Sequence, residues 1–306
     1  MINRSGWVLL LAVSLGAVLR GATARDVSAD ATDRTAVISA FEPEWIALQD
    51  SLQNRKDEII NGTDFATGEI EGKPVVLFLT GISMVNAAMT SQLALDRYRV
   101  RRIVFSGIAG GADADLNIGD VVVPDQWSEY LEAVFARNTE AGYKLPKFVE
   151  HPGENNYGMI FPQPVEIARA PDKPEHRIWF AADPALLAIA RTVAGAAQLS
   201  DCTVERKCLD HRPKVVVGGN GLSGQAFVDN AAFRDYTRRT FKAVALDMES
   251  AAIAHVAYAN KIPFVVFRSL SDLAGGDAGE NQVKTFGDLA STNSAVLVRA
   301  FMKALP

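Results

Sequence analysis

Acidic residues follow two apolar segments in the last quarter of the chain. Glu249 comes shortly after the segment Val244–Leu246, and Asp272 comes shortly after Pro263–Ser269. In open α/β sheets ligands bind at the carboxyl ends of the strands, so both carboxylates are candidates for a functional site. Each also has a structural explanation, because a carboxylate in the first turn of a helix contributes ~0.3–1 kcal/mol and an aspartate often begins a turn. Residue type alone leaves both explanations open.

Glu44 stands in the same kind of position near the start of the chain. The segment Ala36–Ile38 predicts a short buried strand, and Pro43 is favourable in the first turn of a helix that we expect to run on to Leu52. A strand end, a carboxylate and a helix start therefore coincide again. Complementation of the helix dipole is the structural alternative for Glu44, and Glu42 is the less favoured acidic candidate of the same run.

Apolar strands alternate with helical segments along most of the chain. Near the acidic residues we expect strands at Val244–Leu246 and Pro263–Ser269, with a helix at Ser250–Tyr258 between them. The other expected elements are a hairpin of Phe65–Glu71 and Val75–Thr80, strands at Ile103–Ser106 and Lys214–Gly218, and helices at Met84–Tyr98, Pro184–Ala197 and Thr285–Leu305. This alternation predicts one α/β domain with a mostly parallel sheet and right-handed crossovers.

Five glycine-rich residues, Gly107–Gly111, follow the expected strand Ile103–Ser106, and we expect them to form a loop. Glycine lets a backbone approach a ligand closely, but glycine-rich loops after strands also serve tight turns. The spacing matches neither the dinucleotide-binding fingerprint nor a phosphate-binding loop with its lysine. By itself this segment is therefore weak evidence for a site.

Four stretches of the sequence resemble one known family. They are TGISMVNAA (80–88), IVFSGIAGGADADLNIGDVVVP (103–124), DMESAAIAHV (247–256) and PFVVFRSLSDLAGG (263–276). These are similar to the signature of the nucleoside phosphorylases and nucleosidases, which include methylthioadenosine/S-adenosylhomocysteine nucleosidase and the purine and uridine phosphorylases. The resemblance implies a three-layer α/β/α fold with a central mixed, mostly parallel sheet, a nucleoside substrate, no cofactor, and a homo-oligomer, either dimer or trimer.

The resemblance also implies roles for individual residues. Asp272 would be the general acid for the base nitrogen N7, with Ser271 as its partner, and Glu44 would be the general base for a water, positioned with Arg268. The substrate-binding residues implied are Glu249 for the ribose hydroxyls, Met248 against the sugar, Phe227 stacked on the purine, and Gln225, Ile108 and Gly110. The two catalytic carboxyls need different pKa values: we expect burial to raise the pKa of Asp272 and Arg268 to keep Glu44 ionised.

The positions that hold phosphate in the phosphorylases of this family favour hydrolysis. Where those enzymes place two arginines and a hydroxyl, this chain has Phe105, Glu44 and Ile108, and a phosphate dianion needs cationic or N–H donors. Phosphorolysis remains an alternative, with Arg268 and backbone N–H groups binding phosphate. A non-catalytic storage or nucleoside-binding protein is another, because residues 124–127 and 227–230 resemble a secreted subgroup that includes plant bark and vegetative storage proteins.

Composition limits the location and the partners of the protein. Residues 1–24 have the pattern of an export signal, since Arg4 precedes an apolar stretch, Trp7–Leu19, that is too short to span a membrane, and small residues provide a cleavage site. We expect a periplasmic or secreted protein, without stable membrane association, whose N-terminus is flexible over residues 25–35. Arg20 is unusual so close to a cleavage site, and an uncleaved anchor is the alternative. With 31 basic and 36 acidic residues and no basic run, nucleic acid is not an expected partner.

Two features distinguish the remaining domain, residues 36–306. Residues 128–182 show little periodicity and predict an ordered surface insertion, with a lid or an oligomer contact as its alternative roles. Cys202 and Cys208 predict a disulfide in an oxidising compartment. His211 follows them, but two cysteines and one histidine are too few for a structural zinc site, so we expect no metal.

Overall fold

The computed structural model describes residues 31–149 and 155–306. The predicted export signal lies outside the described residues. Within these ranges the first strand begins at Arg34, so the last two residues of the segment predicted to be flexible are already part of the sheet. No helix in the described part of the chain has the length and apolar character needed to cross a membrane.

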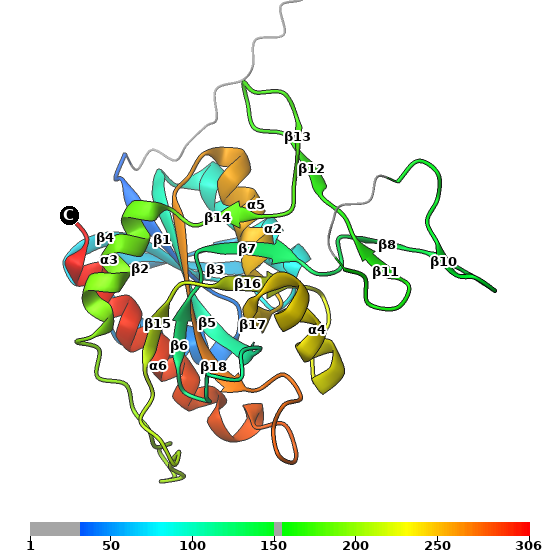
Figure 1. The fold of residues 1–306 in the computed structure, drawn as a ribbon. Helices are drawn as coiled ribbons and strands as arrows, with labels where there is room; N and C mark the ends of the chain where they lie inside the picture. The colour runs from blue at the N-terminus through cyan, green and yellow to red at the C-terminus, as the bar shows by residue number, and fades with distance from the viewer. Residues whose placement is uncertain (1–30, 150–154) are drawn as a thin grey trace, which may run out of the picture.

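A twelve-stranded mixed sheet lies at the centre of the molecule (Figure 1). Along its main path the strands are β14 (Phe180–Ala181), β7 (Gln126–Glu129), β16 (Asn220–Ser223), β17 (Ala243–Asp247), β5 (Val100–Gly111), β1 (Arg34–Ser39), β4 (Lys73–Leu79), β3 (Thr63–Ile70) and β2 (Gln53–Ile60). The other three are β6 (Val121–Val123), β15 (Val215–Val217) and β18 (Phe264–Asp272), and β18 pairs with β5 and β6. The central run β4, β1, β5 and β18 is parallel, which confirms the predicted mixed, mostly parallel sheet.

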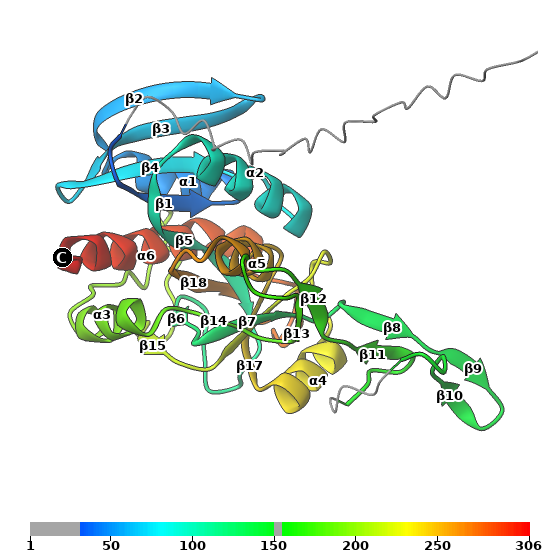
Figure 2. The same cartoon turned by 90° about the horizontal axis from the view of Figure 1, so that it is seen from above.

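Helices cover both sides of the sheet. They are α1 (Glu42–Gln49), α2 (Met84–Arg97), α3 (Pro184–Ala194), α4 (Ala231–Phe241), α5 (Ser250–Asn260) and α6 (Val283–Ala304). Helices α2 and α5 pack against each other on one side, and α6 packs against α1, α3 and strand β18 on the other (Figures 1 and 2). This is the predicted three-layer α/β/α architecture. Every residue of β18 is buried, as expected for a parallel strand covered on both faces.

The glycine-rich segment Gly107–Gly111 is not a loop, contrary to the prediction. It is the last part of β5, a strand of 12 residues that pairs with β18 as far as Gly110. The reason lies in the packing beneath it, because a Cβ on Gly107 would lie 2.0 Å from Arg268 Nη1 and 2.6 Å from Glu44 Oε1. These glycines therefore let the strand pass close over buried charged side chains.

Two further strands depart from the predicted pattern. Residues 220–223, for which no strand was predicted, form β16 beside β17, and a Cβ on Gly221 would lie 2.5 Å from the ring of Trp127. Strand β2 was not predicted, because seven of its eight residues are exposed and carry no apolar alternation. It is an edge strand held by its pairing with β3. Helix α1 ends at Gln49, three residues before the predicted end.

The predicted insertion consists of short antiparallel pairs that reach away from the sheet (Figure 2). They are β8 (Ala133–Phe135) with β11 (Ile160–Pro162), β9 (Arg137–Thr139) with β10 (Gly142–Lys144), and β12 (Val165–Ile167) with β13 (Glu175–Arg177). Its two ends overlap strands β7 and β14 of the main sheet. Elsewhere on the surface, Cys202 and Cys208 form the predicted disulfide.

Candidate active site

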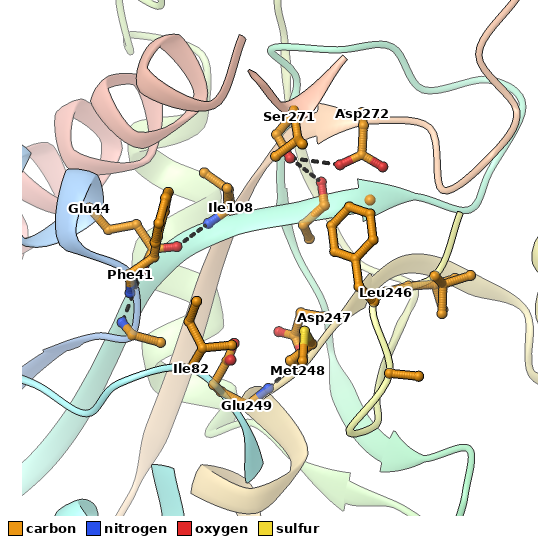
Figure 3. Close-up of a pocket in the computed structure, with 17 residues that line it drawn as sticks. Phe41, Glu44, Ile82, Ile108, Leu246, Asp247, Met248, Glu249, Ser271 and Asp272 are labelled. Atoms are coloured by element: carbon orange, nitrogen blue, oxygen red, sulfur yellow. Dashed lines mark hydrogen bonds between the residues drawn. The ribbon is translucent and has the colours of Figure 1, made fainter. Parts of the chain in front are cut away.

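A pocket of about 200 Å³ lies at the carboxyl ends of β1, β5, β17 and β18 (Figure 3). Eight of the residues predicted for the site line it: Glu44, Ile108, Gly110, Phe227, Met248, Glu249, Ser271 and Asp272. Of the other two predicted residues, Arg268 lies fully buried behind the pocket and Gln225 lies beside it. Phe41, Ile82, Asp247 and Val283 also line the pocket, and none of them was predicted as a site residue.

Glu44 enters the pocket from the first turn of α1, directly after β1. Its Oε2 accepts the backbone N–H groups of Ala40, at 2.9 Å, and Phe41, at 3.0 Å. Its Oε1 accepts the N–H of Ile108, in β5, at 2.8 Å (Figure 3). The side chain is only 2% exposed. Glu44 therefore accepts N–H groups at the start of α1, which is the structural role considered for it above. The same contacts hold its carboxylate in a fixed position in the pocket.

Arg268 is the cation behind the pocket. It projects from β18, is fully buried, and forms ion pairs with three carboxylates: Nε with Asp247 at 2.7 Å, Nη2 with Glu249 at 3.2 Å and Nη1 with Glu44 at 3.7 Å. Its guanidinium also lies over the ring of Phe105, 4.0 Å from the centroid. Phe105 is thus a buried support for Arg268 and does not line the pocket.

One cation shared by three carboxylates leaves an excess of negative charge in a buried place. Burial raises the pKa of Glu249 to about 7, against the opposing effect of Arg268. Burial also raises the pKa of Glu44, although Arg268 and three N–H donors oppose it. Arg268 thus favours the ionised form of Glu44, as expected, but burial outweighs it and the pKa of Glu44 is raised. A raised pKa suits a general base, which works best when its pKa lies near the working pH.

Asp247 is a buried acid to which the sequence alone assigned no role. It accepts hydrogen bonds from the hydroxyls of Ser223 and Ser250 and from the backbone N–H of Glu249. Together with its ion pair to Arg268, these bonds connect β16, β17, α5 and β18. The sequence feature that could have indicated Asp247 is its position at the end of an apolar strand, two residues before Glu249. We conclude that Asp247 fixes the orientation of Arg268.

Glu249 is held at both carboxylate oxygens. Oε2 pairs with Arg268, and Oε1 accepts the backbone N–H of Ser83 at 2.8 Å, at the start of α2. Ser83 has φ +98°, which is unusual for a residue other than glycine. Its hydroxyl donates to Gln225 at 3.1 Å, so Gln225 lies over the start of α2 and outside the pocket lining.

Ser271 and Asp272 mark the opposite end of the pocket. Asp272 Oδ2 accepts the Ser271 hydroxyl at 2.8 Å, and Oδ1 accepts the N–H of Ala274 at 2.8 Å. Burial raises the pKa of Asp272, as the sequence predicted, and these donors oppose the rise. Gly110 leaves room here, since a Cβ would lie 3.1 Å from Asp272 Oδ1. Phe227 lines the pocket with 57% of its surface exposed, so one face of the ring is available for stacking.

The pocket is acidic. Four carboxylates line it (Glu44, Asp247, Glu249 and Asp272), and none of its lining residues is lysine, arginine or histidine. In residues 31–149 and 155–306, no group of three or more His, Cys, Asp or Glu residues could hold a metal ion. The arrangement places one buried carboxyl, Asp272, at one end of the pocket and another, Glu44, at the other, and burial raises the pKa of both.

A model of the Phosphorylase superfamily matches residues 34–303. The chain belongs to the phosphorylase superfamily. A relative from Bacillus thuringiensis, 5'-methylthioadenosine/S-adenosylhomocysteine nucleosidase, is 31% identical over 88% of this chain and 100% of its own length. The solved nucleosidase of that name from Neisseria meningitidis, in complex with methylthio-immucillin-A, has a TM-score of 0.66 at 26% identity and covers 89% of this chain and 99% of its own. The solved nucleosidase from Colwellia psychrerythraea, in complex with adenine, has a TM-score of 0.66 at 28% identity. It covers 89% of this chain and 95% of its own.

Proposed function

We propose that this superfamily member hydrolyses the N-glycosidic bond of a purine nucleoside, releasing the free base and the ribose sugar. The observation that carries the proposal is the pocket itself, in which a buried carboxyl with a raised pKa, Asp272, and a fixed carboxylate, Glu44, stand at opposite ends of the cavity, with Glu249 on the wall between them. The relatives named as nucleosidases support the same activity.

Each carboxyl has one task in the proposed reaction. Asp272 donates its proton to N7 of the departing base, and Ser271 orients it. Glu44 takes a proton from the attacking water. Glu249 accepts the ribose hydroxyls, because its oxygens already face the pocket from a fixed position. The excess of carboxylates also stabilises the positive charge that develops on the ribosyl group as the bond breaks.

Hydrolysis is favoured over phosphorolysis by the charges at the nucleophile end. Phosphate would approach Glu44 and Glu249 with no basic side chain on the pocket wall, since Arg268 already pairs with three carboxylates. Two like unit charges ~4 Å apart repel by ~4 kcal/mol at an effective dielectric near 20, which corresponds to roughly a thousandfold loss of affinity. A neutral water meets no such repulsion.

The substrate we propose is an adenine nucleoside with an apolar 5′ substituent, of the 5′-methylthioadenosine type. Phe41, Ile82 and Val283 add apolar surface to the pocket lining, and Ile82 lies beside Glu249 in Figure 3. A charged or strongly polar 5′ group would lose its hydration against these side chains without gaining a partner. The complexes of the solved relatives with methylthio-immucillin-A and adenine agree with this choice.

A product assay tests the proposed reaction. Purified protein is incubated with 5′-methylthioadenosine, adenosine and inosine in phosphate-free buffer and again with added phosphate, and the base and sugar products are separated by chromatography. We expect free adenine and a reducing sugar in phosphate-free buffer, with no gain on adding phosphate. Strict dependence on phosphate, with sugar 1-phosphate as the product, would establish phosphorolysis instead. Release of no base from any nucleoside would favour the storage or binding role.

We also propose that the protein works outside the cytoplasm as a homo-oligomer. The disulfide between Cys202 and Cys208 supports export, because disulfides persist in oxidising compartments. Exposed apolar residues on and near α2, among them Val85 and Met89, which are 61% and 62% exposed, support an oligomer contact. Cell fractionation with sequencing of the mature N-terminus tests the first proposal. Light scattering of the purified protein tests the second.

A further inference from the structure

Asn281 lies in the loop between β18 and α6 and contacts the proposed general acid. Its amide Nδ2 donates to Asp272 Oδ1 at 3.2 Å and to Asp229 Oδ1 at 3.1 Å. Its Oδ1 accepts the backbone N–H of Val283 at 3.0 Å. A backbone N–H group can only donate, so the side-chain atom of Asn281 that faces Val283 must be the oxygen, Oδ1. The amide nitrogen of Asn281 therefore faces the carboxylates of Asp272 and Asp229.

The bonds at Asp272 distinguish its two oxygens. Oδ1 accepts two N–H groups, from Ala274 at 2.8 Å and from Asn281. Oδ2 has a hydroxyl partner only, Ser271, which can either donate or accept. A proton on Oδ1 would point at two other donors, so the acidic proton belongs on Oδ2. Ala274 and Asn281 together thereby leave Oδ2 as the oxygen that can deliver a proton.

The second contact of Asn281 reaches the segment that carries Phe227. Asp229 follows Phe227 by two residues. The next residue, Asn230, donates its backbone N–H to the carbonyl of Ala274 at 3.1 Å. The backbones approach closely here, because a Cβ on Gly275 would lie 2.3 Å from the nitrogen of Asn230. The loop after β18 and the segment after Phe227 are therefore packed together.

We propose that Asn281 is a positioning residue, which holds Asp272 with its proton on Oδ2 and ties this acid to the segment that stacks on the base. The inference rests on the proposed function and extends it. The Asn281 amide contacts both Asp272, which donates the proton, and Asp229, which follows Phe227. It therefore fixes the direction of proton donation relative to the base stacked on Phe227. Removing the amide should disturb proton delivery more than substrate binding.

The charged groups around Asp272 set the direction of the pH effect. Asp277, in the same loop, accepts the N–H of Leu273 and disfavours ionisation of Asp272, and Asp229 faces the same amide from the Phe227 side. Arg234 of α4 lies near Gly276, but its guanidinium donates to the carbonyl of Gly111. The amide of Asn281 stabilises the ionised form of Asp272, so its loss should raise the pKa of Asp272.

Two substitutions separate the positioning role from a structural one. Asn281→Ala removes all three hydrogen bonds, whereas Asn281→Asp keeps an acceptor for Val283 and replaces the donor by a carboxylate. The matched control is Gln282→Ala, since the Gln282 side chain donates to the carbonyl of Glu280 and does not contact Asp272. We expect Asn281→Ala to lower kcat on the order of ten- to a hundredfold, as for loss of a hydrogen bond to a charged group, with a smaller change in KM.

The pH profile and a measurement independent of activity complete the test. We expect the alkaline limb of kcat/KM to move to higher pH in Asn281→Ala, further in Asn281→Asp, and not at all in Gln282→Ala. The ionisation of Asp272 is followed directly by difference infrared spectroscopy of carboxyl-labelled protein, with Asp272→Asn as the blank. If Asn281→Ala lowers thermal stability but leaves both the Asp272 titration and kcat within twofold of wild type, the inference is wrong. If the wild type cleaves no nucleoside while the Asp272 titration still moves with Asn281, the proposed function fails and the positioning role stands.

Discussion

Glu44 and Glu42 lie two positions apart in the first turn of α1 and provide a matched pair of substitutions. Glu44 is 2% exposed and accepts three backbone N–H groups, whereas Glu42 is on the exposed side of the helix. We expect Glu44→Gln to abolish most of the hydrolysis while Glu42→Gln changes little. The comparison separates a catalytic carboxylate from a helix-start carboxylate, because both residues can complement the dipole of α1.

The cost of Glu44→Gln follows from its hydrogen bonds. Glutamine has one side-chain oxygen, and the best placement puts it at the Oε2 position, where it keeps the N–H groups of Ala40 and Phe41. Its NH2 then faces the N–H of Ile108 and the guanidinium of Arg268, so one buried donor loses its partner. An unsatisfied buried donor costs ~1–3 kcal/mol of stability. The loss of a general base lowers turnover by ~10²–10⁴-fold.

The assay is release of free base from 5′-methylthioadenosine in phosphate-free buffer, beside chemical denaturation of each variant. Glu42→Gln should stay within ~0.5 kcal/mol of wild type, as surface substitutions usually do, and should keep its activity. Removing the charge of Glu44 should not create phosphorolysis, since no cation is gained. The reasoning is refuted if Glu44→Gln retains activity within a few fold of wild type, or if both variants lose activity to the same extent.

Three further substitutions test other parts of the molecule. Asp272→Asn should fold normally and lower turnover by ~10²–10⁴-fold, because asparagine can donate a hydrogen bond but cannot transfer a proton; a rate near wild type would make Asp272 a turn residue. Burial raises the pKa of Glu249 from 4.5 to about 7, so the folded chain holds a proton that the unfolded chain releases in this range. The stabilisation is complete below pH 4.5 and is lost as the pH rises through 7, by about 3 kcal/mol. Glu249→Gln should remove this dependence from urea denaturation curves at pH 4.5, 6 and 8, and an unchanged pH dependence would contradict the assignment. Replacing Cys202 and Cys208 together by serine should lower the free energy of unfolding by ~2 kcal/mol, since the disulfide closes a short loop; a loss of folding altogether would show that the disulfide does more than constrain this loop.

Local sequence patterns predicted the mostly parallel α/β sheet and marked the acidic candidates, whereas the three layers and the roles of these residues came from the family resemblance. Apolar runs such as Pro263–Ser269 are continuous because central parallel strands are buried on both faces. A polar residue at the end of such a run, as at Glu249 and Asp272, must lie at the carboxyl edge of the sheet. These inferences need only the periodicity of the apolar residues and the position at which each apolar run ends. Both can be read from residues that are neighbours in the sequence.

The errors arose where contacts between distant segments decide the structure. Gly107–Gly111 has the composition of a loop, but Gly107 makes room for Arg268 and Glu44, which are far away in sequence. Strand β2 has no apolar alternation, because it is held by backbone pairing at an exposed edge. No local pattern distinguishes either case.

The sequence by itself determined that carboxylates follow strands at one edge of the sheet, and the tertiary structure decided which residues line the pocket and which partners they have. Arg268 lies beside Glu44, as expected, but it also pairs with Asp247 and Glu249, and burial raises the pKa of Glu44 despite this cation. Asn281 carries no signal at all in the sequence, since only folding brings its amide to Asp272. A pKa depends on every charge and dipole within a few ångströms, and those neighbours come from segments that the chain order does not place together.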